Sequence, residues 1–339
     1  MAAACRASGP DNPGLALGAW MGEAARAGRD KLTILATPLL ASFGDWAEQL
    51  VAESTGKAGT GIVPVVGEPL RDATDYGEDR CFVLLHSRDE LVPEHEALAG
   101  ALEEAGHPVR RVGLAGAYGL GAEFVRWEVA TAAAGIVLGI DPFDQPNVQE
   151  SKDATKALLD AYRREGSLPA PAPIVAEPGV SAHAVAAVLD DPVTVDGALR
   201  ALVASAEAGD YLAILAYLPQ DPDTEARLQS LRRRLGEATG AATTLGFGPR
   251  FLHSTGQLHK GGPPSGIFLQ LTAEPRRDLP IPGWEESFGI LVAAQALGDL
   301  ESLQRREQRV LRLHFNDPDT VVDRLAALVE RALPATART

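Results

Sequence analysis

The stretch Asp210–Leu218 reads DYLAILAYL, and a helical pattern over Asp223–Gly240 follows it after a short polar turn. A short run that is almost wholly apolar, and bounded by turn residues, is typical of a strand buried on both faces. A buried strand followed by a helix is the repeating unit of a parallel sheet flanked by helices. This stretch therefore predicts an α/β fold.

Runs of the same kind lie on either side of it, with helical patterns between many of them. We expect further strands at Lys31–Thr37, Gly61–Val66, Cys81–His86, Val109–Leu114, Ala241–Gly248, Gly266–Thr272 and Val310–Phe315. We expect further helices at 13–28, Phe43–Ala52, Glu94–Ala105, Leu120–Leu138, Asp153–Glu165 and Asp317–Leu333. Such alternation indicates parallel sheets with helices on both faces.

The chain is long enough for two cores, since a single core rarely grows past about 300 residues. Residues 1–12 are small and polar, and we expect them to be disordered. A first α/β unit is expected over 13–166. A proline-rich linker over 167–189 follows it, because prolines cluster there. A second, smaller α/β unit is expected over 190–335.

The acidic balance of the chain limits its partners. A formal net charge of −15 repels nucleic-acid backbones and anionic lipids, so neither partner is expected. No apolar run reaches the roughly 18 residues of a membrane span, and the first residues lack an apolar signal segment. Cys5 and Cys81 are too few for a disulfide framework. We expect a cytoplasmic protein, in which any anionic substrate needs local positive charge.

Three polar segments are candidates for chemistry. Residues Gln49–Lys57 read QLVAESTGK, and Gln49 and Glu53, four apart, share one helical face. Residues Pro249–Pro263 read PRFLHSTGQLHKGGP, a positively charged loop between two expected strands. Strand-end loops hold ligands in α/β proteins. Both patterns also occur on ordinary solvated surfaces, and that alternative stays open.

The third segment, Phe143–Lys152, reads FDQPNVQESK. Lys152 falls in the first turn of an expected helix, where the helix dipole disfavours a cation. Such a lysine either has a specific role or is solvated at the surface. The cysteine and histidine spacings do not predict zinc, there is no phosphate-binding loop, and Gly116–Gly121 lacks the spacing of a dinucleotide-binding loop. We therefore expect no metal and no cofactor.

These segments resemble motifs of the phosphoglucose isomerases. Residues 53–57, with Gln49 before them, resemble the family's E-S-x-G-K motif. Residues 135–152 resemble its second signature, which ends F-D-Q-x-G-V-E-x-x-K. Residues 252–257 resemble the L-H-S-x-G-Q loop of the bacterial enzymes. Residues 248–263 and 287–303 are similar to the C-terminal region of bifunctional transaldolase/phosphoglucose isomerases.

The resemblance implies sugar-isomerase (SIS) subdomains built on flavodoxin-like parallel sheets. It implies an enzyme that interconverts glucose 6-phosphate and fructose 6-phosphate through an enediol intermediate, without metal or redox cofactor. Glu53 matches the glutamate that moves the proton, His253 the histidine that assists ring opening, and Lys152 the lysine beside the ring oxygen. Substrate-binding residues are expected among the polar side chains of the same motifs, namely Gln49, Gln145, Gln257 and Lys260. A homo-oligomer is expected by the same likeness.

The chain also departs from the family pattern. Asn147 replaces a glycine and Gln149 a glutamate in the second signature. The matched residues run Glu, Lys, His along the chain, whereas most members run Glu, His, Lys. His86 and His259 are therefore alternatives to His253.

Neither the family's Gly-Gly-Arg loop and phosphate cradle nor the transaldolase lysine is found. We expect an isomerase fragment that acts with a missing N-terminal portion. Alternatively, Arg250 and Lys260 hold the phosphate in a complete isomerase, or the chain is a non-catalytic SIS-type sugar-phosphate binding module.

Overall fold

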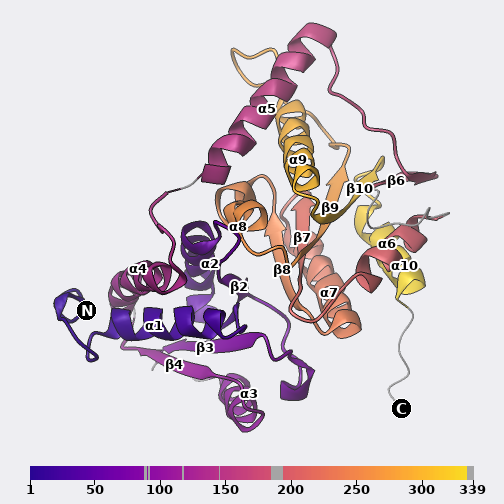
Figure 1. The fold of residues 1–339 in the computed structure, drawn as a ribbon. Coiled ribbons are helices and arrows are strands. Elements are labelled where there is room, and N and C mark those ends of the chain that lie inside the picture. Colours follow the sequence, from indigo (N-terminus) through magenta and orange to yellow (C-terminus); the bar gives the residue numbers. More distant parts are fainter. Residues whose placement is uncertain (88–89, 91, 117, 145, 185–193, 334–339) are drawn as a thin grey trace. The chain divides into compact units, whose positions relative to one another are not determined.

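The computed structural model describes residues 1–333 except 88–89, 91, 117, 145 and 185–193. The chain folds into two compact units (Figure 1). Unit 1 contains Met1–Gln145 and His253–Pro264, and unit 2 contains Pro146–Leu252 and Ser265–Thr339. A short segment from the second half of the chain thus belongs to unit 1.

Unit 1 is built on a parallel sheet whose strand order among the described residues is β2-β1-β3-β4. The strands are β1 (Lys31–Ala36), β2 (Val63–Val66), β3 (Arg80–Ser87) and β4 (Val109–Leu114). The helices are α1 (Pro13–Arg26), α2 (Ala41–Thr55), α3 (Pro93–Glu104), α4 (Gly119–Leu138) and α8 (Thr255–Gly261), and short 3-10 turns lie at Ala4–Arg6, Pro38–Leu40 and Ala73–Asp75. These strands match the expected ones to within two residues at each end.

The two faces of this sheet are both buried, as β3 shows. Alternate residues of a strand point to opposite faces. Cys81, Val83 and Leu85 pack into a core with α1, α2 and α4, whereas Phe82 and Leu84 pack with α3 on the other side. The sheet is therefore covered on both faces, as its nearly continuous apolar strands predict.

Residues 1–12, for which disorder was predicted, include a 3-10 turn at Ala4–Arg6 and contacts to the start of α1. Asn12 accepts hydrogen bonds from the backbone of Gly14 and Leu15 and so caps α1. Its amide nitrogen donates to the carbonyl oxygens of Cys5 and Ala7, at 2.9 and 2.8 Å. One side chain thus both starts the helix and holds the preceding residues, which composition alone did not reveal.

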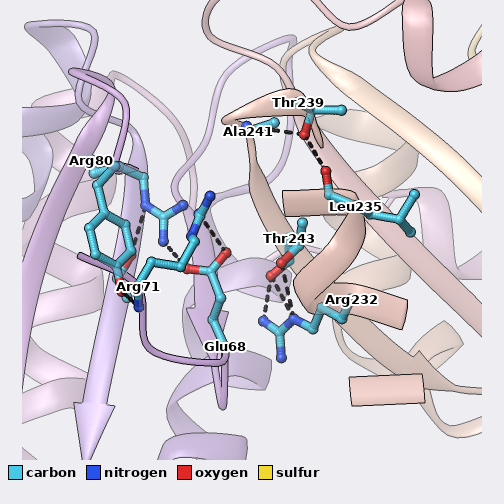
Figure 2. A network of polar contacts seen from close by, with 10 residues as sticks. Glu68, Arg71, Arg80, Arg232, Leu235, Thr239, Ala241 and Thr243 are labelled. Carbon is cyan, nitrogen blue, oxygen red and sulfur yellow. Dashed lines mark hydrogen bonds and ion pairs between the residues drawn. The ribbon is translucent and has the colours of Figure 1, made fainter. Parts of the chain in front are cut away.

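A buried ionic network lies at the start of β3 (Figure 2). Glu68 forms ion pairs with Arg71 and Arg80, and all three side chains are almost fully buried. Arg80 also donates through Nε to Thr33 Oγ1 at 3.0 Å and lies over the Tyr76 ring. Removing one partner of such a network leaves an uncompensated buried charge, so we interpret it as structural.

Unit 2 is built on a larger sheet, with the order β5-β6-β10-β9-β7-β8 among the described residues. The strands are β5 (Val175–Glu177), β6 (Val180–Ala184), β7 (Tyr211–Tyr217), β8 (Ala242–Phe247), β9 (Gly266–Ala273) and β10 (Arg309–Phe315). The helices are α5 (Pro146–Glu165), α6 (Val195–Ala204), α7 (Pro222–Thr239), α9 (Phe288–Arg305) and α10 (Val321–Ala332), and a 3-10 turn spans Arg250–His253. Strands β7 to β10 are parallel, and β6 is antiparallel to β10.

One face of this sheet is apolar and packs against α6, α7 and α10. On the other face, Gln270 of β9 donates through Nε2 to the carbonyl oxygen of Ala296 in α9, at 3.1 Å. Helix α7 ends at Gly240, where φ is +69°. Within the same unit, buried Arg232 of α7 donates through Nε to the carbonyl oxygen of Thr243 in β8, at 3.0 Å (Figure 2).

The parallel α/β fold class is confirmed, but the organisation differs from the prediction in three respects. The division falls at residues 145 and 146 rather than near 166, because α5 begins at Pro146 and packs with α9 through Leu158 and Leu297. The expected linker contains β5 and β6, which pair with each other and with β10. The second unit carries the larger sheet of the two among the described residues. No helix in the described part of the chain could cross a membrane.

Candidate functional site

The candidate site lies in unit 1, at the C-terminal end of α2. Glu53 is in the last turn of this helix and is partly buried, while Gln49 is exposed one turn earlier. Gln49 Nε2 lies 3.5 Å from Glu53 Oε2, at the limit of a hydrogen bond. The two side chains therefore share one face of the helix, as their spacing indicates.

A tight turn follows Glu53. The Thr55 hydroxyl donates to the carbonyl oxygen of Val51 at 2.7 Å and accepts from the backbone nitrogen of Ile62 at 3.0 Å. Ala58 and Gly59 have positive φ angles of 55° and 77°, and Lys57 and Thr60 exchange backbone hydrogen bonds around them. Positive φ at both central residues is the geometry of a type I′ turn. The turn thus fixes the path of the E-S-T-G-K segment after Glu53.

Lys57 joins the first motif to the second. Its side chain is buried, with 4% of the residue exposed. Its ammonium group donates to both the carbonyl oxygen and the carboxylate of Asp144, and Nζ to Oδ1 measures 2.9 Å. Asp144 belongs to the F-D-Q sequence. Lys57 therefore anchors that segment, a contact that neither motif predicts alone.

Helix α8 joins the third motif to the first. Gln257 Nε2 donates to the carbonyl oxygen of Gly56 at 2.9 Å, and the backbone nitrogen of Gly59 donates to the carbonyl oxygen of Gly261 at 2.9 Å. A Cβ atom at position 56 would lie 2.4 Å from Leu258 Cα. Only glycine permits this approach, so the glycine of E-S-T-G-K is explained by the packing of α8.

The histidines of this region differ in their surroundings. His253, the predicted ring-opening residue, is exposed at the start of the segment that belongs to unit 1. His259 is 3% exposed, and burial, reinforced by the neighbouring Lys260 charge, lowers its pKa to about 3. His86 is partly buried in β3. Of the three, His253 is the one whose side chain is open to solvent, which is compatible with the predicted role.

Other predicted residues lie elsewhere. Lys152 is exposed on α5 of unit 2, so it is not one of the residues that unit 1 brings together. Arg250 is exposed and also belongs to unit 2, whereas Lys260 is 6% exposed on α8 of unit 1. Gln145 lies outside the described residues. Unit 1 thus places Gln49 beside Glu53 on α2 and holds Gln257 against Gly56, three residues after Glu53.

The arrangement provides a carboxylate on a rigid helix end beside a turn held from two sides. Gln257, predicted to bind substrate, is buried and uses its amide nitrogen on the backbone. Such a bond positions the turn and does not present that nitrogen to a ligand. Among the described residues, no group of three or more His, Cys, Asp or Glu could hold a metal ion.

Comparison with known proteins finds a curated relative of known activity. The chain is 29% identical over 173 residues to a glucose-6-phosphate isomerase of Rubrobacter xylanophilus. That match covers 40% of this chain and 40% of the relative, so well under half of either protein is compared. No protein-family model matches the chain.

Two solved structures are similar over most of the chain. A hypothetical protein of Thermus thermophilus aligns with 98% of this chain and 86% of its own, at 14% identity and a TM-score of 0.35. A glucose-6-phosphate isomerase of Chlamydia trachomatis aligns with 95% of this chain and 67% of its own, at 13% identity and a TM-score of 0.31. Likenesses this distant carry no argument about function.

Proposed function

We propose that this chain catalyses an aldose–ketose isomerisation of a sugar phosphate, the interconversion of glucose 6-phosphate and fructose 6-phosphate. The observation that carries the proposal is the attachment of all three matched motifs to the turn after Glu53. Asp144 holds Lys57, and Gln257 holds Gly56. The similarity to a curated glucose-6-phosphate isomerase supports a sugar-phosphate isomerase or binding role.

In this proposal Glu53 is the catalytic base. Its carboxylate removes the proton from C2 of the open-chain aldose, and the electron pair forms the enediolate. The same carboxyl group then returns the proton to C1 while the hydroxyl proton of O2 moves to O1, so that the ketose forms and the enzyme is unchanged. A positioned carboxylate contributes through general acid–base catalysis, worth about 10²- to 10⁴-fold. Holding the helix end and turn rigid keeps this group in place.

The remaining residues keep roles that rest on the resemblance. His253, exposed beside α8, assists ring opening. Gln49, next to Glu53, contacts the substrate. Gln257, which the resemblance assigns to substrate binding, is given a different role in this proposal and positions the turn through Gly56. The roles of Lys152 and Lys260 stay predictions, which a Lys152→Met and a Lys260→Met variant test separately.

The test is a dehydrogenase-coupled assay of fructose 6-phosphate conversion. It compares the wild type with Glu53→Gln and with Glu78→Gln, an exposed glutamate of the same unit. Turnover that is lost only in Glu53→Gln supports the proposal. The assay is repeated with a phosphate-binding subdomain of an isomerase supplied separately, because the relative is much longer than the matched stretch.

A non-catalytic binding module predicts a different result. Fructose 6-phosphate would then raise the thermal midpoint of the wild type. No turnover would appear in either arrangement. That combination would contradict the isomerase proposal.

A further inference from the structure

The unit 2 sheet carries a row of polar residues near the C-terminal ends of its parallel strands. Tyr217 of β7 pairs in register with Thr272 of β9, and Thr272 pairs with His314 of β10. Arg312 lies two residues before His314 and pairs with His183 of β6. Residues in register share a face of the sheet. We refer to these five side chains as the Arg312 cluster.

The burial of this row requires an explanation. On the opposite face of the same strands, Leu269, Leu271, Leu311 and Leu313 form an apolar core. On the polar face, Arg312 is 8% exposed, Tyr217 6% and Thr272 5%. Burying polar side chains in a sheet costs stability unless hydrogen bonds compensate. A polar row of this kind often marks a ligand site, and the carboxyl ends of parallel strands are where α/β proteins bind ligands.

A chain of hydrogen bonds orients Arg312. Its Nε donates to Thr272 Oγ1 at 3.1 Å, and Thr272 Oγ1 lies 3.0 Å from His314 Nδ1. His314 Nε2 lies 3.3 Å from Glu274 Oε1. Because Nε can only donate, the Thr272 oxygen accepts from Arg312. The one hydroxyl hydrogen of Thr272 is shared between two acceptors, His314 Nδ1 and the carbonyl oxygen of Leu313 at 3.4 Å. The hydrogen bond from Nε to Thr272 therefore holds the guanidinium group of Arg312 on its Nε side.

Two sets of donors remain unused among the described residues. Neither terminal nitrogen of the Arg312 guanidinium group donates a hydrogen bond to the described residues. Neither nitrogen is fully enclosed by protein atoms, so part of the small exposed surface of Arg312 belongs to these two nitrogens. The Tyr217 hydroxyl is enclosed and has no hydrogen-bond partner within the described chain. An arginine fork with both terminal nitrogens available matches the geometry of a phosphate or carboxylate.

The charges of the cluster favour an anion, although carboxylates lie nearby. Burial lowers the pKa of His183 to about 4, and burial also lowers the pKa of His314, so both rings are neutral near pH 7. Burial raises the pKa of Tyr217 well above its usual value, so its hydroxyl remains a donor. Glu274 is bonded to His314 and largely solvated, and buried Asp299 interacts with Tyr217 and Gln270.

We propose that the Arg312 cluster binds a phosphate group, either inorganic phosphate or the phosphate of a small monoester. The two terminal nitrogens of Arg312 take two phosphate oxygens, and the Tyr217 hydroxyl donates to a third. Two donors to adjacent oxygens are the bidentate arrangement that arginine forms with phosphate. The proposal does not rest on isomerase activity, because neither Glu53 nor His253 takes part.

The experiment titrates inorganic phosphate into the full chain at constant ionic strength. Binding is followed by the arginine Nε–Hε resonances in nitrogen-15 NMR and by the thermal midpoint. The Arg312 resonance should shift with phosphate. The Arg312→Gln variant should bind about 10- to 100-fold more weakly, because charge-assisted hydrogen bonds are lost. Arg312→Lys keeps the charge but loses the fork, and should lie between the two.

Tyr217→Phe separates binding from folding. Its lost hydroxyl has no partner in the described chain, so the variant should fold with an unchanged or higher thermal midpoint without phosphate. It should nevertheless bind phosphate about 3- to 10-fold more weakly. Arg233→Gln, an exposed arginine of α7, is the matched charge control and should bind as the wild type does.

The proposal is overturned if no Arg312 resonance shifts with phosphate, or if Tyr217→Phe and Arg312→Lys bind as tightly as the wild type. A parallel titration with fructose 6-phosphate distinguishes the two ligand sources, since a monoester site binds the sugar phosphate at least as tightly as inorganic phosphate. Glu53→Gln should leave both titrations unchanged. Loss of turnover and loss of phosphate binding can therefore be observed independently.

Discussion

The amide nitrogen of Gln257 donates a hydrogen bond of 2.9 Å to the carbonyl oxygen of Gly56, across 201 residues of sequence. The two residues come from different motifs, and their contacts explain why position 56 is a glycine and position 257 a glutamine. Gly56 lets Leu258 approach, and Gln257 satisfies the carbonyl at the end of α2. The helix end that carries Glu53 is thus supported by a segment from the second half of the chain.

Gly56→Ala is expected to destabilise unit 1 by about 1–3 kcal/mol, because overpacking against backbone cannot be relieved by a rotamer change. The added Cβ would lie 2.4 Å from Leu258 Cα. Urea unfolding followed by tryptophan fluorescence measures this, since Trp20, Trp46 and Trp127 all lie in unit 1. Gly100→Ala is the control, because no atom lies within 4 Å of a Cβ there. It should be neutral or stabilising by about 0.5–1 kcal/mol; equal effects at both positions would refute the packing explanation.

Gln257→Leu removes the hydrogen bond to Gly56 and leaves a buried carbonyl oxygen without that donor. We expect a cost of about 1–3 kcal/mol in the free energy of unfolding. If Gln257 positions the turn, kcat should fall more than KM rises. Gln220→Leu, at an exposed position of unit 2, should change neither quantity. An increase in KM alone would instead indicate direct substrate contact.

Lys57→Met breaks the link to Asp144 while keeping much of the side-chain volume. The Lys57 side chain is 5% exposed and that of Asp144 is 58% exposed, so the remaining carboxylate can be solvated. The expected cost is therefore about 1–3 kcal/mol, below that of breaking a fully buried pair. Hydrogen exchange should show faster opening at the turn over 56–61. Unchanged exchange there would mean that Asp144 does not anchor the turn.

The stability of unit 1 should fall as the pH is lowered from about 6.5 towards about 3. The pKa of His259 is about 3 in the folded chain, against its usual value of 6.5. Between these values the unfolded chain binds a proton that the folded chain does not, so stability rises with pH. One such histidine contributes up to about 1.4 kcal/mol per pH unit. His259→Gln should flatten this slope in the tryptophan-monitored unfolding, and an unchanged slope would contradict the assignment.

The alternation of buried strands and helices was sufficient to predict the parallel α/β fold. Strands such as β3 and β7 are apolar on both faces, so few structures other than a buried strand fit their sequence pattern. The prediction failed where tertiary contacts override composition. The stretch that contains β5 and β6 is rich in proline and suggests a linker, yet pairing with β10 makes it part of a sheet. The prolines lie outside the two strands, which read VAE and VSAHA, so no ladder hydrogen bond of β5 or β6 is lost to a proline.

The candidate site was predictable as motifs but not as an assembly. The spacing of Gln49 and Glu53 placed both on one face of α2, as the structure has them. The segment Thr255–Gly261 was expected to be a loop, but it is α8, because it packs against the end of α2. The contacts of Lys57 with Asp144 and of Gln257 with Gly56 join distant segments, and no local pattern encodes them.

The most direct test of the account is solvent hydrogen exchange into fructose 6-phosphate in D2O, followed by proton NMR. The wild type, with the phosphate-binding subdomain supplied if it is needed for turnover, should incorporate deuterium at the carbons between which the proton moves. Glu53→Gln should slow this incorporation by about 10²- to 10⁴-fold, as expected for loss of the general base. Glu78→Gln should match the wild type. Exchange at the wild-type rate in Glu53→Gln, or neither exchange nor turnover in the wild type, would contradict the proposal that Glu53 transfers the proton.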